Sequence, residues 1–328
     1  MRNRHTTMRT NQQQAGLTMV ELMVALAISS FLMIGAIQIY AQSRQAFVIN
    51  ESIARVQETA QFAMDTIEAD LRMASNWGRN SRALAVEGRS LEGSVNPKGL
   101  PAPGDCGADW ALDLAMFVDG ENNAYTLPCG AMGGVQANSD VVTVRRVAVA
   151  ASALEAGRMQ IQSTRIQGEL IADGVMPVTY TAADSSTHNL IVNSYYVAVQ
   201  SDLIPGAPTL RRKSLTSIGG VPTIVDQEVA PGIENLQIQF GVDVNADNAV
   251  DRYVNPGDPI YDPAAVGYIP GVRIITARIW LVIRGITREV GITDLRDYEP
   301  GDIDLGIYND AFRRMQVSKT ILMRNARS

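Results

Sequence analysis

The sequence predicts an α+β fold, in which one long N-terminal helix packs on a mainly antiparallel β-sheet head. Three features of the 328-residue chain support this prediction. The segment from Thr10 to Ser43 carries one formal charge, Glu21, and no proline precedes Pro97. After residue 79, short β-branched runs alternate with Gly, Pro, Asn and Asp, as strands and turns do. The composition, 46% hydrophobic and 19% charged, is that of a folded chain.

The N-terminal segment has the charge pattern of a membrane-inserted chain. Residues 1–16 contain Arg2, Arg4 and Arg9 and no acid. The apolar run that follows, residues 17–41, is about long enough to span a bilayer as a helix. Positive charge before the span predicts that the N-terminus stays in the cytoplasm and that the bulk of the chain lies outside.

Glu21 lies inside this apolar run, where a carboxylate costs about 2.5–3.5 kcal/mol on insertion scales. An ordinary signal peptide is disfavoured by this charge and by the lack of a clear small-x-small cleavage site. A plain membrane anchor tolerates a carboxylate near the end of the span, but it leaves Glu21 without a purpose.

The stretch GLTMVEL, residues 16–22, resembles the class III signal of type IV pilins and their relatives. The resemblance implies that a prepilin peptidase cuts between Gly16 and Leu17 and that the new N-terminus at Leu17 is methylated. It also implies a role for Glu21 in assembly or processing. Residues 1–16 would then be a leader and residues 17–41 a transmembrane and filament-core helix. Many major pilins have phenylalanine where this chain has Leu17, a departure that bears on methylation more than on cleavage.

The resemblance also gives Glu21 a physical role. When such helices pack side by side in a filament, the N-terminal amine of one subunit lies among apolar side chains. The carboxylate of a neighbouring subunit can pair with that amine, and breaking such a buried pair costs about 3–5 kcal/mol. Glu21 is therefore expected to find its partner on assembly.

The helix is expected to continue beyond the span, from about residue 18 to about residue 76. Apolar residues recur at steps of three and four, which places them on one helix face: Ile49, Ile53, Val56, Ala60, Ala63, Ile67, Leu71 and Ala74. Asn76 and Gly78 provide a stop signal. Residues 42–78 are thus expected to form an amphipathic continuation of the helix.

The head, residues 79–328, is expected to be globular, β-rich and extracytoplasmic. No internal repeat or low-complexity linker divides it. Five segments read as strands because they are rich in β-branched and aromatic residues: residues 140–150, 189–200, 208–215, 233–244 and 272–285.

Three head segments resemble PilW-like minor pilins: VAPGIENLQIQFGVDVNADNAVDRYV, VRIITARIWLVIR and DAFRRMQVSKTILMRN. The resemblance implies a minor pilin that takes part in the assembly or initiation of type IV pili. Its partners would be other minor pilins, the major pilin, the prepilin peptidase and the inner-membrane assembly platform. It would reside in the bacterial inner membrane as a single-pass protein with a periplasmic head, and then in the pilus at the cell surface.

Two alternatives stay open. A J-type minor pseudopilin of a type II secretion system shares the same layout. An anchored calcium-dependent adhesin or enzyme is less well supported, because the chain has no GxSxG motif and the head has one histidine, His188, which is expected at the surface. We therefore expect a non-enzymatic protein.

Export would place Cys106 and Cys129, the two cysteines, in an oxidising compartment. We expect them to form a disulfide, which would contribute roughly 3 kcal/mol in the chain-entropy model. Two buried thiols are the alternative.

An Asn/Asp-rich segment after the fourth predicted strand has oxygens at alternate positions, as in the start of a calcium loop. Its expected ligands are Asp243, Asn245, Asp247, the carbonyl of Ala249, and Asp251. The pattern is incomplete, because Asn248 replaces the turn glycine and Val254 stands where a glutamate is expected. A solvated turn is the alternative, so Ca²⁺ is a possible cofactor and no other is expected.

The chain has a net charge of −6, which argues against general nucleic-acid binding. Its basic clusters are therefore expected on solvated strand faces: Arg145-Arg146, Arg211-Arg212-Lys213 and Arg313-Arg314.

Overall fold

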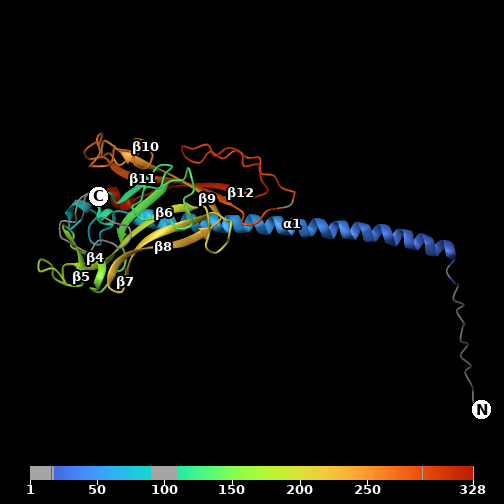
Figure 1. Ribbon diagram of the computed structural model, residues 1–328, viewed down its shortest axis with the longest axis horizontal. Coiled ribbons are helices and arrows are strands. Elements are labelled where there is room, and N and C mark those ends of the chain that lie inside the picture. The colour runs from blue at the N-terminus through green and yellow to red at the C-terminus, as the bar shows by residue number, and fades with distance from the viewer. Residues whose placement is uncertain (1–15, 17, 90–108, 290, 328) are drawn as a thin grey trace, which may run out of the picture. The chain divides into compact units, whose positions relative to one another are not determined.

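The computed structural model describes residues 16, 18–89, 109–289 and 291–327 (Figure 1). The chain separates into two compact units, residues 1–51 and residues 52–328, here called the first and second units. One helix, α1 (Met19–Met73), begins in the first unit and ends in the second. The expectation of a single long helix is confirmed.

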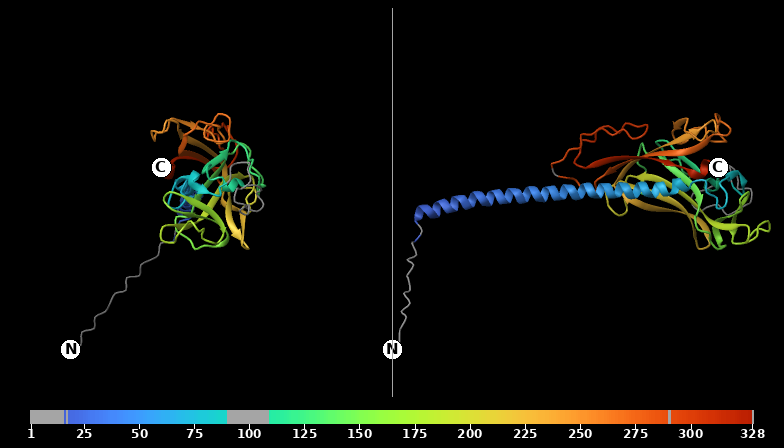
Figure 2. Two further views of the ribbon diagram at one scale, coloured as in Figure 1. Left: turned by 90° about the vertical axis from the view of Figure 1, so that its left-hand side faces the viewer. Right: turned by 180° about the vertical axis from the view of Figure 1, so that it is seen from behind.

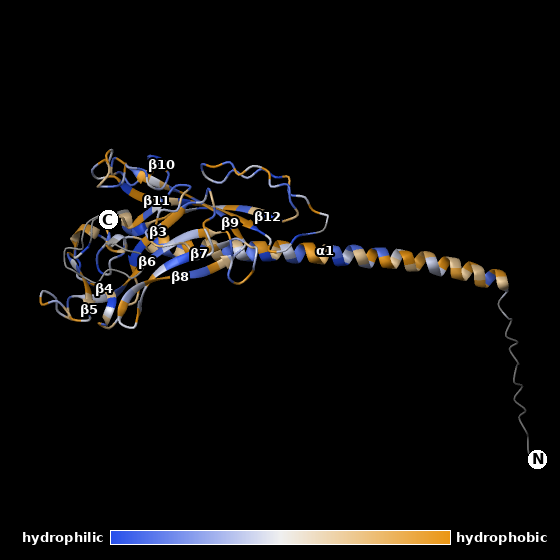
Figure 3. Ribbon diagram, viewed as in Figure 1, coloured by the Kyte–Doolittle hydropathy of each residue, from blue (hydrophilic) through white to orange (hydrophobic). Residues whose placement is uncertain are grey.

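In the first unit, most of α1 is coloured as hydrophobic in the view of Figure 3, with a few polar residues among the apolar ones. Its side chains are exposed in the isolated chain; Phe31, for example, is 78% exposed. This part of α1 is long and apolar enough to cross a membrane.

The helix ends three residues before the expected position, at Met73. Ser75 takes a left-handed conformation with φ 62°, and its hydroxyl donates to the carbonyl of Ser81 at 2.9 Å. Gly78 has φ 89°, and a Cβ built there would lie 2.4 Å from Ser163 Oγ. The turn after the helix therefore requires glycine at position 78.

The larger sheet of the second unit has eight strands. Along its path the order is β1 (Val86–Glu87), β5 (Gly168–Asp173), β4 (Ala156–Ser163), β6 (Ser186–Ala198), β3 (Val141–Val147) and β2 (Val118–Glu121). β7 (Thr209–Ile218) pairs with β6, and β8 (Val221–Pro231) pairs with β7. All of these pairs are antiparallel except β1 with β5. β6 is 13 residues long, which lets it pair with three different strands.

The smaller sheet has four antiparallel strands in the order β10 (Arg252–Val254), β9 (Ile233–Asp243), β11 (Arg273–Arg284) and β12 (Arg314–Leu322). Short 3₁₀ helices are η1 (Ala83–Ala85), η3 (Asp109–Leu112) and η4 (Arg324–Arg327). Asn325 in η4 donates to the carbonyl of Ala74 at 3.3 Å, so the C-terminal residues lie beside the end of α1 (Figure 2). The expectation of a mainly antiparallel sheet domain is confirmed.

One hydrophobic core joins α1 to both sheets. The helix contributes most of the stripe expected from the sequence, with Val56, Ala60, Ala63, Ile67 and Leu71 buried, and Ala74, just after the helix, is buried as well. The larger sheet contributes Val144 and Leu210, and the smaller sheet contributes Phe240 and Ile279. Burying a side chain of the size of leucine contributes about 1.5–3 kcal/mol, so this stripe is a major part of what holds the helix in the second unit.

Candidate assembly site

The N-terminal motif forms a reciprocal cap at the start of α1. The backbone N–H and the hydroxyl of Thr18 donate to the Glu21 carboxylate at 2.9 and 3.0 Å. The backbone N–H of Glu21 donates to Thr18 Oγ1 at 3.3 Å. This is a capping box, in which two otherwise unpaired N–H groups of the first turn are satisfied. Gly16 is exposed, and Leu17 lies outside the described residues.

The capping box leaves the Glu21 carboxylate able to accept further hydrogen bonds. Its carboxylate lies in the first turn of α1, where the helix dipole favours negative charge. The side chain is exposed in the isolated chain, and a carboxylate has about four acceptor sites. It can therefore accept a hydrogen bond from a further cationic donor without giving up the N–H of Thr18. Sequence reasoning gave a role to Glu21 and included Thr18 in the signal, but it gave Thr18 no role of its own.

In the second unit, α1 is attached to the larger sheet through a buried carboxylate. Asp70 is 4% exposed and accepts from Arg146 Nε and Nη2 at 2.9 and 2.6 Å. It also accepts from Asn193 Nδ2 and Tyr195 Oη, each at 2.6 Å. Burial and the charge of Asp70 raise the pKa of Tyr195 well above its usual range. Two residues before Asp70, Glu68 pairs with Lys319 of β12.

The start of α1 in the second unit is attached to the connection between β11 and β12. Ser52 donates its hydroxyl to Glu289, and Arg313 donates to both oxygens of that carboxylate. Although burial opposes ionisation, the hydrogen bonds from Arg313 and Ser52 lower the pKa of Glu289. Polar anchors thus hold the helix at both ends of residues 52–73.

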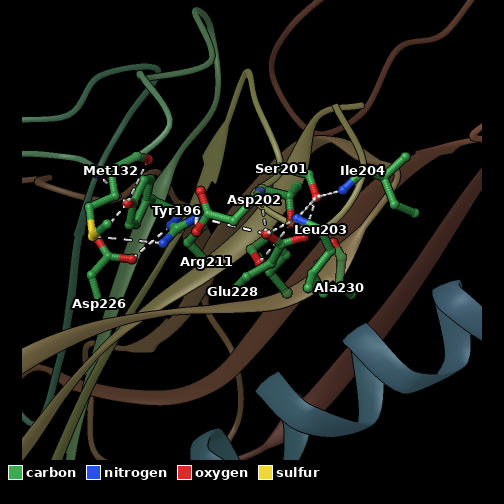
Figure 4. A network of polar contacts seen from close by, with 12 residues as sticks. Met132, Tyr196, Ser201, Asp202, Leu203, Ile204, Arg211, Asp226, Glu228 and Ala230 are labelled. Atoms are coloured by element: carbon green, nitrogen blue, oxygen red, sulfur yellow. Dashed lines mark hydrogen bonds and ion pairs between the residues drawn. The ribbon is translucent and has the colours of Figure 1, made fainter. Parts of the chain in front are cut away.

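The expectation that the basic clusters form solvated strand faces is wrong for four of their members: Arg145, Arg211, Lys213 and Arg314 are all buried. Successive strand residues point to opposite faces, so alternate residues of these basic clusters are directed inward. Arg211, 1% exposed, donates to Asp226 and Asp202, each at 2.8 Å (Figure 4). A buried charge that is paired in this way is a structural feature of the sheet.

Figure 4 also shows hydrogen bonds of the same network that attach Ser201 and Asp202, which follow β6, to β8. Glu228 on β8 accepts from the Ser201 hydroxyl and, at 2.7 Å, from the backbone N–H of Asp202. On the other side, Tyr196 Oη donates to Asp226 at 2.6 Å and accepts from the N–H of Met132 at 2.9 Å.

His188 was expected at the surface, but it is buried. Its Nδ1 lies 2.9 Å from the carbonyl of Ala148, and its Nε2 lies 2.9 Å from Ser186 Oγ. Both ring nitrogens therefore have structural partners, and the expectation was wrong because His188 lies on β6, the strand that is paired on both sides.

The candidate calcium loop is closed by its own hydrogen bonds. Asp243 accepts from the backbone of Ala246 at 2.7 Å and of Asn248 at 2.9 Å, and from Arg273 Nη2 at 3.0 Å. Asp251 accepts from the N–H of Val244 at 2.7 Å. Asn245 and Asp247 accept from backbone N–H groups two residues on. A cation would have to compete with the guanidinium of Arg273, and calcium binding here stays a prediction.

The predicted disulfide also stays a prediction. Cys129 is buried and packs near Ile224, whereas Cys106 lies outside the described residues.

Two family models match this chain. Residues 194–325 match the model described as type IV pilus-assembly protein W, and residues 11–37 match the prokaryotic N-terminal methylation motif. No curated protein and no solved structure matches the chain. The first match covers part of β6 and all strands after it, and the second covers Gly16, Thr18 and Glu21. These two matches agree with the resemblance of the sequence to PilW-like, type IV pilus-related pilins with a prepilin signal.

Proposed function

We propose that this chain is a minor pilin that takes part in the assembly or initiation of type IV pili. In this proposal prepilin peptidase removes residues 1–16 by cutting between Gly16 and Leu17, and Leu17 is then methylated. Residues 17–41 anchor the protein in the inner membrane and later pack in the filament, while residues 42–78 join them to the head, residues 79–328. The family matches favour a structural, non-enzymatic role.

The observation that carries the proposal is the position of Glu21. It lies in an apolar, exposed stretch of α1, four residues after Leu17, and its described hydrogen bonds come from Thr18. Within the described part of the chain it forms no ion pair. Cleavage would create a cationic amine on a neighbouring copy or a related subunit, and that amine is the partner that a carboxylate in an apolar bundle requires.

The capping box supports a two-stage role for Glu21. In the membrane, the donors from Thr18 reduce the cost of keeping a carboxylate in the span. On assembly, the amine of a neighbouring subunit adds a charge-assisted hydrogen bond, which is roughly twice as strong as a neutral one. Thr18 can keep donating while the second donor arrives, so the carboxylate does not have to be desolvated without a partner.

The partners follow from this role. They are the other minor pilins, the major pilin, the prepilin peptidase and the inner-membrane assembly platform. A pseudopilin of a type II secretion system is the rival function, and the match of residues 194–325 to a pilus-assembly family favours the pilus.

The test replaces Glu21→Gln in the native gene and counts surface pili. The glutamine can still accept from Thr18 but carries no charge. Glu58→Gln is the matched control, because Glu58 is an exposed acid on the same helix beyond the apolar part. Immunoblots check that both variants are made and that the leader is removed. The proposal expects loss of pili with Glu21→Gln alone, and normal piliation with both variants would overturn it.

A further inference from the structure

One face of the smaller sheet carries a buried amide oxygen that has no donor among the residues that the structure describes. Gln237 on β9 is 1% exposed, and its Nε2 donates to Asn123 Oδ1 at 3.2 Å, to the carbonyl of Asn138 at 3.0 Å and to Asn235 Oδ1 at 3.1 Å. Because three acceptors surround the nitrogen, the orientation of the amide is determined. Gln237 Oε1 therefore points elsewhere, and it has no hydrogen-bond partner among the described residues.

A second buried oxygen lies in the same region. Asn122 Nδ2 donates to Asp302 Oδ2 at 3.0 Å, which determines the orientation of this amide as well. Asn122 Oδ1 is buried and has no donor in the part of the chain that the structure describes. Asp302 Oδ2 also accepts from Asn255 Nδ2.

These groups belong to one cluster built from three segments. Asn122 follows β2, Gln237 lies on β9, and Asp302 lies on the connection from β11 to β12. Gly301 lies against Gln237: a Cβ built at Gly301 would be 2.9 Å from Gln237 Cβ and 3.6 Å from Gln237 Oε1. Gly301, the residue before Asp302, therefore lies against the side chain of Gln237.

The cluster has negative charge that no cationic side chain of the described residues neutralises. Asp140 lies behind it, and its two oxygens accept from the backbone of Asn123 and of Ile238, each at 2.8 Å. Burial, together with the charge of Asp302, raises the pKa of Asp140. Among the described residues, no lysine, arginine or histidine forms an ion pair with Asp140 or Asp302.

A water molecule could donate to the oxygens of Asn122 and Gln237, but it would not neutralise the charge of Asp302. A hard divalent cation prefers carboxylate and amide oxygens. Among the described residues, the cluster offers two amide oxygens without a donor and a carboxylate that no cationic side chain neutralises. We infer that Asn122 Oδ1, Gln237 Oε1 and the Asp302 carboxylate bind a divalent cation, with Ca²⁺ as the matching ion.

This inference does not depend on the proposed role in pilus assembly. The inferred cation site is also distinct from two other candidate sites. One is the loop from Asp243 to Asp251, in which Arg273 already neutralises a carboxylate. The other is the exposed group Asp297, Glu299 and Asp304, whose carboxylate oxygens lie within 4.8 Å of one another. Both supply matched controls.

The experiment compares the thermal midpoint of the full chain in detergent with EDTA and with added CaCl₂. The variants are Asp302→Asn, with Asp304→Asn and Asp251→Asn as controls. The inference expects Ca²⁺ to raise the midpoint of the wild type and of both controls, because a ligand that binds only the folded state stabilises it. Asp302→Asn should lose that rise, with a Kd at least about tenfold higher, since even outer partners of metal ligands contribute 10–100-fold.

Three results would overturn the inference. The first is a wild type whose midpoint does not respond to Ca²⁺, in which case buried water alone meets the unpaired oxygens. The second is an undiminished response in Asp302→Asn. The third is a response abolished by Asp304→Asn or Asp251→Asn, which would place the cation at that other site. Asp302→Ser serves as the second variant if Asp302→Asn does not unfold cooperatively in EDTA.

Discussion

Replacing Asp70 by asparagine removes the buried charge that attaches α1 to the larger sheet. The carboxylate accepts four hydrogen bonds, from Arg146, Asn193 and Tyr195, at 2.6–2.9 Å. The amide nitrogen of the new asparagine is itself a donor, so at least one of these hydrogen bonds would be lost. It would also leave the guanidinium of Arg146, 15% exposed, without its counter-charge. Breaking a buried pair on one side costs about 3–5 kcal/mol, and we expect a loss of free energy of unfolding in that range.

Urea unfolding of the full chain in detergent, followed by tryptophan fluorescence, measures this loss. For a slope of about 3 kcal/mol/M, the midpoint should fall by roughly 1–1.7 M. Asp65→Asn is the control, because Asp65 is exposed on the same helix, bonds to Gln61 at 2.7 Å and lies 3.9 Å from Lys319. Surface interactions of this kind contribute at most about 1 kcal/mol. Equal midpoints for Asp70→Asn and Asp65→Asn would refute the view that Asp70 anchors the helix.

Three further predictions concern the pKa of Asp140, the backbone at Gly78 and the pairing of the two cysteines. Burial raises the pKa of Asp140 to about 7, so the folded state holds this proton more tightly than the unfolded state does. The stabilisation that Asp140 contributes is therefore present at low pH and is lost as the pH rises through about 7. In EDTA, the wild type should lose more free energy of unfolding than Asp140→Asn between about pH 5 and about pH 8, and parallel pH profiles would contradict the assignment. Gly78→Ala should destabilise the chain by about 1–3 kcal/mol, because φ there is 89° and the new Cβ would lie 2.4 Å from Ser163 Oγ; an unchanged urea midpoint would contradict this. Thiol titration of the unreduced, denatured protein should detect no free thiol, whereas two reactive cysteines would exclude the pairing of Cys106 with Cys129.

The long helix and its buried stripe could be predicted from the sequence because their signals are local. Spacing alone placed Val56, Ala60 and Ile67 on one face, and the structure buries all three. The strands β3, β6, β7, β9 and β11 were predicted because each is rich in β-branched or aromatic residues. The segments that became β8 and β4 were not, since β8 has Pro222 and Pro231 near its ends and β4 has few such residues.

The polar interior could not be predicted, because its partners are distant in sequence. Arg211 is buried because strand pairing brings it to Asp226, and Arg314 is buried because it reaches Glu234 of β9. The local sequence does not determine either pairing register. The capping box at Thr18 is the exception among the missed features, since Thr followed three residues later by Glu is a local signature.

The cluster of Asn122, Gln237 and Asp302 was missed for the same reason. Its residues come from three separate segments, and no motif connects them. Two of them have a buried oxygen without a donor in the described part of the chain, and this can be recognised only when the side-chain orientations are known.

The N-terminal mass of the mature protein tests the central claim most directly. Pilin isolated from piliated cells, or from their membranes, can be digested and its N-terminal peptide measured by mass spectrometry. The account predicts a chain that begins at Leu17 and carries a methylated amine. A chain that keeps residues 1–16, or that begins at any other residue, would contradict it, because Glu21 would then lack the neighbouring amine on which its role depends.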